Sequence, residues 1–294
     1  MHDPVESPGA TRQALRRMAQ ERRGVLVAGA FNALSARIAA DCGFEAVYLS
    51  GAGLTNMHLG LPDFAFMGLR DIEDHTARIR DSISVPLIVD ADTGFGNALN
   101  VRHTVRVLER AGADAIQLED QVFPKRCGHF TGKEVAPLEE MLGKIWAAVD
   151  ARRDPDLLVI ARTDARAMLG FEQAVDRARR FAEAGADILF VEAPEGAPEV
   201  RLLPKLLDAP QLINIVIGGR TPVLDAGELG KLGFGFVLYA NAALQGAVLG
   251  MQNALGRLKT NGRLDEDPSL VVSFSERQRL VDKPLYDSLN TRYA

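Results

Sequence analysis

Residues 90–96 read DADTGFG and place two carboxylates, Asp90 and Asp92, two positions apart just after an apolar run. Alternate residues of a strand face the same side, so both carboxylates can point at one site, and the glycines allow a tight turn. A few hard oxygen ligands suit Mg²⁺ that keeps several waters, with Mn²⁺ as an alternative. Taken alone, the segment also fits a turn or helix-capping aspartate. Glu119 and Glu192 stand at matching positions after other apolar runs, and they favour the metal site.

A second candidate is the thiol of Cys127, within the sequence KRCGH at 125–129. Four basic or potentially basic side chains surround it: Lys125, Arg126, His129 and Lys133. They would favour the thiolate and attract a carboxylate substrate. Most lone cysteines are small buried hydrophobes, and we predict this for Cys42. For Cys127, in a polar glycine-bearing loop, we predict a reactive role, with His129 tuning or orienting the thiol.

Polar or charged residues stand at one end of almost every apolar run. They are Ser50, Asp90, Asp92, Glu119, Asp120, Arg162, Asp164, Glu192, Asn214 and Asn241. In an α/β barrel such strand ends form one rim, where active sites lie. Carboxylates converging there would repel one another unless a cation held them. Arg162 either pairs with these carboxylates or binds a substrate carboxylate, and both roles can hold together.

The elements that must position these residues alternate between helix and buried strand. The expected strands are 24–29, 46–50, 86–91, 115–120, 157–162, 188–193, 212–216 and 236–240. Amphipathic patterns between them, such as 100–112 and 171–185, predict helices. Eight such units predict an α/β protein with a single (β/α)8 TIM-barrel domain over 1–294 and a core at about 24–260. The alternative is an open doubly wound sheet, but no G-x-G-x-x-G follows the first strand.

Two segments lie outside the expected barrel, an N-terminal helix at about 10–22 and a C-terminal tail at about 265–294. We expect the basic first helix to present a solvated or inter-subunit face, and the tail to pack on the barrel or on a neighbouring subunit. The net charge of -5 gives no electrostatic case for nucleic acid or an acidic membrane surface. The sequence has no signal segment, no membrane-spanning run and no disulfide framework, so a cytoplasmic protein is expected.

The motifs fall in the order of a known superfamily. They are SGAG (50–53), VDADTGFG (89–96), QLEDQ (117–121), KRCGH (125–129), ARTDA (161–165), FVEAP (190–194) and NIVIGGRTP (214–222). Over roughly 24–260 they resemble the isocitrate lyase and phosphoenolpyruvate mutase superfamily. KRCGH is typical of its lyase branch, which includes 2-methylisocitrate lyase, 2,3-dimethylmalate lyase and oxaloacetate hydrolase. The resemblance implies a (β/α)8 barrel whose last helix swaps between subunits of a homodimer or homotetramer.

The resemblance also implies roles for individual residues. Substrate-binding roles fall on Ser50, Gly51, Ala52, Gly128, Arg162, Glu192 and Asn214. Asp90, Asp92 and Glu119 resemble the magnesium site, and Asp63 resembles a further acidic residue of the active site. Cys127 resembles the acid that protonates the departing carbanion, with His129 beside it. The implied catalytic set is therefore Cys127, His129, Arg162 and Asp63.

The implied activity is Mg²⁺-dependent cleavage of a carbon–carbon bond in a small 2-hydroxy or 2-keto dicarboxylate, as in 2,3-dimethylmalate or 2-methylisocitrate lyase. Two departures argue against a tricarboxylate: Ile217 stands where the lyases commonly have Glu, and residues 239–246 lack the Arg of 2-methylisocitrate lyases. Alternatives are an oxaloacetate hydrolase or decarboxylase, a carboxyvinyl-carboxyphosphonate or phosphoenolpyruvate mutase, and a non-catalytic binding protein. The mutases and decarboxylases of the family lack the loop cysteine, so Cys127 favours a lyase or hydrolase.

Overall fold

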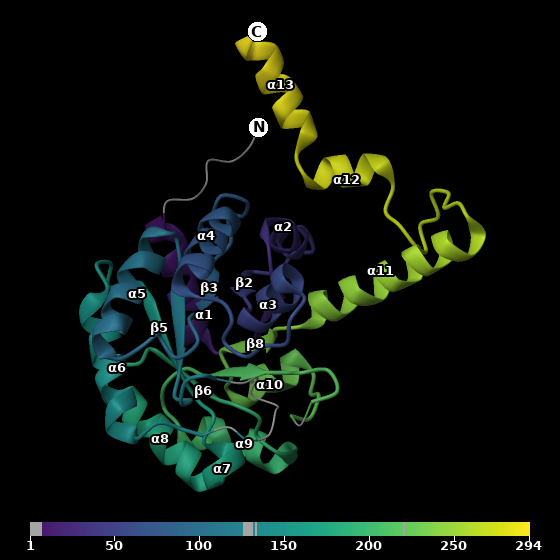
Figure 1. Ribbon diagram of the computed structural model, residues 1–294. Coiled ribbons are helices and arrows are strands. Elements are labelled where there is room, and N and C mark those ends of the chain that lie inside the picture. The colour runs from purple at the N-terminus through teal and green to yellow at the C-terminus, as the bar shows by residue number, and fades with distance from the viewer. Residues whose placement is uncertain (1–7, 126–131, 133, 220) are drawn as a thin grey trace.

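Eight parallel strands form a nearly closed barrel in the computed structural model, which describes residues 8–125, 132, 134–219 and 221–294 (Figure 1). The strands are β1 (Val25–Ala30), β2 (Ala46–Leu49), β3 (Leu87–Asp90), β4 (Ala115–Glu119), β5 (Leu158–Thr163), β6 (Ile188–Val191), β7 (Leu212–Asn214) and β8 (Phe236–Tyr239). β1 pairs with both β2 and β8, and the sheet therefore curves back on itself. Only an isolated bridge between Leu189 and Gln211 joins β6 to β7 among the described residues. The barrel prediction is confirmed, and the open doubly wound sheet is wrong.

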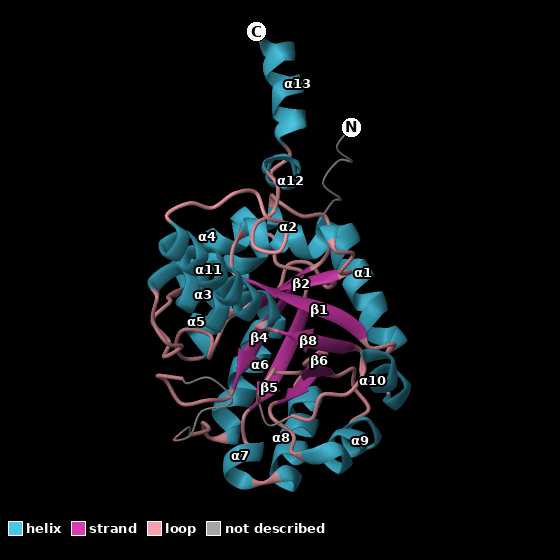
Figure 2. Cartoon of the chain, turned by 90° about the vertical axis from the view of Figure 1, so that its right-hand side faces the viewer, coloured by secondary structure: helices cyan, strands magenta, loops and turns pink. Residues whose placement is uncertain are grey.

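Helices surround the barrel (Figure 2). They are α2 (Ala33–Asp41), α3 (Gly51–Leu59), α4 (Leu69–Arg80), α5 (Ala98–Arg110), α6 (Leu138–Ala151), α7 (Arg166–Leu169), α8 (Phe171–Glu183), α9 (Gly196–Leu206) and α10 (Ala226–Leu232). One apolar cluster fills the barrel interior, with Val27, Ile160 and Phe236 among its members. A larger cluster lies between strands and helices. The strands are thus apolar on both faces, as parallel strands must be when helices cover them.

Helix α1 (Pro8–Glu21) closes the amino-terminal end of the barrel. Leu15 and Ala19 belong to the interior cluster. Arg12 is buried and its Nη1 lies 2.8 Å from Asp154 Oδ2. Thr11 Oγ1 donates to Asp114 Oδ1 at 2.7 Å. The prediction of a solvated or inter-subunit basic face is therefore wrong for Arg12, because acidic residues at this end of the barrel draw it inward.

Three C-terminal helices extend away from the barrel, namely α11 (Ala242–Asn261), α12 (Phe274–Leu280) and α13 (Lys283–Tyr293) (Figures 1 and 2). Leu244 is the one buried residue of α11. Arg279 of α12 reaches back to α2, where its Nη1 and Nη2 donate to the two Asp41 carboxylate oxygens at 2.7 and 2.6 Å. Within the described ranges, no helix has both the length and the apolar character needed to cross a membrane.

Candidate active site

A small pocket of about 40 Å³ lies at the carboxyl-terminal ends of the strands. This volume holds a few water molecules in the ligand-free chain. The predicted residues that line it are Ser50, Ala52, Asp63, Asp90, Glu119, Arg162, Glu192 and Asn214. Tyr48, Lys125, Phe190 and Asn241 also line it. Side chains far apart in the sequence therefore meet at one rim, as the strand-end pattern predicts.

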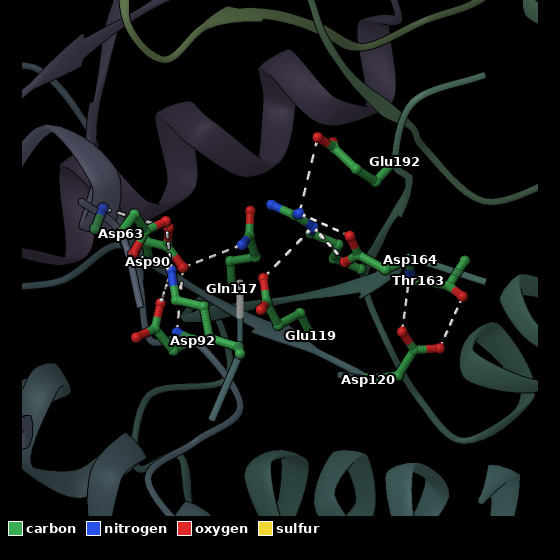
Figure 3. Close-up of polar contacts among 12 residues, drawn as sticks. Asp63, Asp90, Asp92, Gln117, Glu119, Asp120, Thr163, Asp164 and Glu192 are labelled. Carbon is green, nitrogen blue, oxygen red and sulfur yellow. Dashed lines mark hydrogen bonds and ion pairs between the residues drawn. The ribbon is translucent and has the colours of Figure 1, made fainter. Parts of the chain in front are cut away.

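Asp90 lines the acidic side of the pocket, and Asp92 lies beside it (Figure 3). The Asp92 backbone N–H donates to Asp90 Oδ1 at 3.1 Å. Strand β3 ends at Asp90, and Asp92 has a φ of +48°. The two aspartates lie side by side, but not for the reason that the strand pattern indicates. A left-handed turn, rather than the alternation of a strand, directs Asp92 into the site.

The start of α3 lies against this acidic pair. Ser50 is the N-cap residue of α3, and its Oγ accepts from the Gly53 N–H at 3.1 Å. The Gly51 N–H donates to Asp90 Oδ2 at 3.3 Å. A Cβ atom on Gly51 would stand 3.2 Å from both Asp90 Oδ2 and Asp92 Oδ1. A side chain at 51 would therefore crowd both carboxylates, and glycine lets the helix approach them this closely.

Lys125 also belongs to the acidic side of the pocket, although its sequence context suggests a role beside the thiol of Cys127. Its Nζ lies 2.7 and 2.8 Å from the Asp63 carboxylate oxygens and 2.9 Å from Asp92 Oδ1. Burial alone would lower the pKa of Lys125, but the surrounding carboxylates raise it well above its usual value. The sequence predicts that this ammonium serves the thiol of Cys127, whereas the structure places it against the carboxylates of Asp63 and Asp92. Because Lys125 belongs to the KRCGH motif, its contact with the carboxylates was not predictable from the sequence.

Two further residues missed in the sequence connect β2 and β4 to Asp90. The buried Tyr48 hydroxyl donates to Gln117 Oε1 at 2.9 Å. Gln117 Nε2 in turn donates to Asp90 Oδ1 at 3.2 Å. Burial and the nearby Asp90 carboxylate raise the pKa of Tyr48 well above 10. Both residues lie within apolar runs, AVYL and AIQLE. A single polar side chain among apolar ones was the one sign in the sequence that they take part in the site.

The charge on this side of the pocket is suited to a divalent cation. Asp63, Asp90, Glu119 and Glu192 line the pocket against two cationic residues, Lys125 and Arg162, among the described residues. Four carboxylates with two cations leave excess negative charge, to which Asp92 adds.

The protonation of the carboxylates supports the same conclusion. Burial raises the pKa of Asp92 to about 7, despite the opposing effect of Lys125. Burial also raises the pKa of Glu119 well above its usual value, despite Arg162. Glu119 Oε1 is buried and has no hydrogen-bond partner in the described part of the chain. A nearby cation would stabilise the ionised forms of both.

Direct coordination by the protein alone is limited. In the described part of the chain, no three acidic, His or Cys side chains are arranged to hold a metal ion together. Mg²⁺ keeps several waters when it binds to proteins, so one or two carboxylates suffice for direct contact. The donor set of Asp90, Asp92 and Glu119 therefore fits a hydrated Mg²⁺ rather than a fully protein-bound ion.

Arg162 is surrounded by Asp164, Glu119 and Glu192. Its Nε and Nη2 donate to the Asp164 carboxylate at 2.9 and 3.0 Å. Its Nε lies 3.5 Å from Glu119 Oε2, and its Nη2 lies 3.7 Å from Glu192 Oε1. These carboxylates outweigh burial and raise the pKa of Arg162. Both predicted roles remain open to it, because it pairs with protein carboxylates and also lines the pocket.

The wall formed by β7 and β8 is neutral over the described residues. The Oδ1 atoms of Asn214 and Asn241 are buried and have no hydrogen-bond partner there. Val216, Leu238 and Ala240 complete this wall. Ile217 is 51% exposed and does not line the pocket. A substrate group facing this wall would meet amides and aliphatic carbons.

Some predicted residues are not placed in the pocket. The residues outside the described part of the chain are Arg126, Cys127, Gly128, His129 and Lys133. Asp120 does not line the pocket. Its carboxylate accepts hydrogen bonds from Thr163, Asp164 and Arg177. Cys42 is exposed, so the prediction of a buried small hydrophobe is wrong for the single chain.

Comparison with known proteins identifies the family. Residues 15–259 match the family described as phosphoenolpyruvate phosphomutase. The chain belongs to the phosphoenolpyruvate mutase and isocitrate lyase superfamily. It is 40% identical over 284 residues to 2,3-dimethylmalate lyase of Eubacterium barkeri, covering 97% of this chain and 98% of that one. It is 43% identical over 260 residues to 2-methylisocitrate lyase of Aeropyrum pernix, covering 88% and 82%.

These two relatives place the chain in the lyase branch of the superfamily and confirm the prediction of an enzyme of the carbon–carbon lyase class. A solved structure of phosphonopyruvate hydrolase, complexed with oxalate and Mg²⁺, superposes with a TM-score of 0.86 at 32% identity. It covers 96% of this chain and 99% of that one. The metal and the oxalate are bound to that protein. The present chain shares its fold.

Proposed function

We propose that this superfamily member is a Mg²⁺-dependent lyase that cleaves a small 2-hydroxy dicarboxylate, with 2,3-dimethylmalate as the foremost candidate. The observation that carries the proposal is the pocket itself, which Asp90, Glu119 and Arg162 line together, with Asp92 beside Asp90. The lyase relatives and the Mg²⁺-containing structure at 32% identity support it. Mg²⁺ held by the acidic residues and the Arg162 guanidinium would each bind one carboxylate of a dicarboxylate substrate.

The described residues divide the binding work. Asp90, Asp92 and Glu119 would hold the hydrated Mg²⁺, and Lys125 would fix Asp63 and Asp92 beside it. The start of α3 (Ser50, Gly51 and Ala52) and the Arg162 guanidinium would bind carboxylate oxygens, since helix amino ends and guanidinium groups both favour anions. The Ser50 and Gly51 N–H groups already donate to Ala30 O and Asp90 Oδ2, so the Ser50 side chain and the Ala52 N–H would make the contact. Glu192 and Asn214 line the remaining pocket and would orient the substrate.

Bond cleavage follows from these positions. Bound Mg²⁺ lowers the energy of negative charge on the substrate oxygen. As the 2-hydroxyl passes its proton to an ionised carboxylate of the pocket and becomes a carbonyl, the C2–C3 bond would break and its electron pair would remain on C3. For 2,3-dimethylmalate the products are pyruvate and, once C3 gains a proton, propionate. Cys127, named by the sequence, would deliver that proton from its thiol as a general acid, with His129 beside it.

The neutral β7–β8 wall restricts the substrate. A third carboxylate placed against Asn214, Val216 and Leu238 would be buried without a cationic partner among the described residues, which costs free energy. A methyl substituent would instead contact aliphatic carbons. We therefore favour 2,3-dimethylmalate over 2-methylisocitrate.

A substrate panel tests the proposal. The purified chain with Mg²⁺ is incubated separately with 2,3-dimethylmalate, 2-methylisocitrate, oxaloacetate and phosphonopyruvate, and products are identified by NMR. We expect pyruvate and propionate from 2,3-dimethylmalate at the highest kcat/KM. Oxalate and acetate from oxaloacetate would instead identify a hydrolase, and phosphoenolpyruvate from phosphonopyruvate a mutase. Either result as the dominant activity would overturn the proposal.

We further propose that α11 is exchanged between subunits of a homodimer or homotetramer. An apolar groove over β1 and β8 is lined by Leu26, Ile38, Phe44, Val223 and Tyr239. Leu26 is 41% exposed, although a barrel strand is normally covered by helices. Helix α11 follows β8 but leaves this groove, carrying its own exposed apolar residues. A second copy's α11 would cover both apolar surfaces.

A further inference from the structure

A buried polar network lies behind the pocket and does not line it (Figure 3). At its centre is Asp120, which is 1% exposed. Its Oδ2 accepts from Thr163 Oγ1 at 2.7 Å and from Arg177 Nε at 2.9 Å. Its Oδ1 accepts from the Asp164 backbone N–H at 2.9 Å. Arg177 comes from α8 and is itself 8% exposed.

The network leads directly to Arg162. Asp164, whose backbone N–H is held by Asp120, accepts the Arg162 guanidinium with both carboxylate oxygens. The register of β4 and β5 places Arg162 opposite Glu119. The direction of the Arg162 guanidinium thus depends on Asp164, and the backbone of Asp164 depends on Asp120.

The same network fixes the chain where it returns to the barrel after the loop that follows β4. Arg177 Nη2 donates to the Ala136 carbonyl at 2.8 Å. The Ala136 N–H donates to the Asp120 carbonyl at 2.7 Å, and the Val122 N–H donates to the Glu134 carbonyl at 2.8 Å. One guanidinium therefore bonds both to Asp120 and to the returning chain.

A purely stabilising role explains these contacts poorly. A buried ion pair contributes little net stability compared with well-packed apolar side chains of the same volume, because both charges lose their hydration. Here the pair instead directs bonds to two backbone positions, at Asp164 and Ala136. Directed bonds of this kind determine geometry.

We propose that Arg177 and Asp120 are positioning residues for the reaction. They hold Arg162 at its angle in the pocket through Asp164, and they hold Ala136 against the end of β4. The kinetic part of this inference rests on the proposed function, whereas its geometric part does not.

Arg177→Lys is the first test. Lysine keeps the positive charge near Asp120, but it lacks the planar fork that reaches Asp120 and Ala136 together. We expect an unfolding temperature close to that of the wild type and a fall in kcat/KM of about 100-fold, the loss that a 1 Å misplacement can cause. Most of it should appear in KM, because Arg162 binds the substrate before and during bond cleavage. Arg179→Lys, an exposed change on the same helix, is the control and should leave both constants unchanged.

Thr163→Val is the second variant and is used if Arg177→Lys does not fold. It removes one hydrogen bond to Asp120 while leaving every charge in place. The same direction of change in KM is expected, with a smaller size. An unchanged KM in this folded variant would overturn the inference.

Hydrogen–deuterium exchange provides a readout that needs no substrate. The amides of Ala136 and Asp164 both donate to Asp120, so they should exchange faster in Arg177→Lys than in the wild type or in Arg179→Lys. Unchanged exchange at both amides, or faster exchange with unchanged kcat/KM, would overturn the inference. If the wild type cleaves no compound of the panel, the proposed function fails, while the exchange result still decides whether Arg177 holds the two amides.

Discussion

The pocket separates its charged side chains into two groups. Lys125 serves the Asp63 and Asp92 side, whereas Arg162 lies between Glu119, Asp164 and Glu192. Neither cation neutralises its group. Both groups therefore keep excess negative charge, and burial raises the pKa values of Asp92 and Glu119. These are the physical reasons for assigning a divalent cation to Asp90, Asp92 and Glu119.

The thiol of Cys127 provides a test at the scale of one residue. Cys127→Ser replaces an acid of moderate pKa with a hydroxyl that donates protons poorly to carbon. We expect the rate of carbon–carbon cleavage to fall by about 10²- to 10⁴-fold. Mg²⁺ affinity by calorimetry and the circular dichroism spectrum should be unchanged. Cys42→Ser is the matched control, and equal activity of the two variants would exclude Cys127 as the acid.

At the scale of elements, the sequence predicted the strands well. Each expected apolar run overlaps one observed strand, because strands covered on both faces require continuous apolar residues. The rim was predictable for the same reason, since polar residues end these runs. The C-terminal tail was predicted to pack on the barrel or a neighbour, and α12 does contact α2 through Arg279 and Asp41.

The contacts between elements were less predictable. The left-handed turn at Asp92, the inward direction of Lys125 and the burial of Arg12 each depend on a partner distant in the sequence. A local pattern shows that a side chain is charged, but it does not show which charge it will meet. These pairings therefore appeared only with the fold.

Asp114 tests how elements are joined at the amino-terminal end of the barrel. It accepts from Thr11 of α1, from Arg80 of α4 and from the Leu87 N–H of β3. Asp114→Ala leaves the Arg80 guanidinium buried without this partner, and we expect the free energy of unfolding to fall by about 3–5 kcal/mol in urea titrations. Asp176→Ala, which removes an exposed ion pair, should change it by less than about 1 kcal/mol. Equal effects would contradict the assignment of Asp114 as a structural junction.

At the scale of the whole molecule, the extended α11 and the open apolar groove predict an oligomer. Light scattering after size exclusion should give a mass at least twice that of one chain. Leu26→Lys places a charge in the groove and should shift the protein toward a monomer. Leu99→Lys changes a residue that is 76% exposed on α5 and should leave the mass unchanged. A wild-type monomer at micromolar concentration would refute the exchange of α11.

The most direct test is a Mg²⁺ titration of 2,3-dimethylmalate cleavage in the metal-stripped wild type and in Glu119→Gln. We expect no pyruvate without metal, saturable recovery with Mg²⁺ in the wild type, and a Mg²⁺ requirement shifted about 10- to 100-fold higher in the variant. Cleavage that persists in the stripped enzyme, or an identical Mg²⁺ requirement in the two proteins, would contradict it.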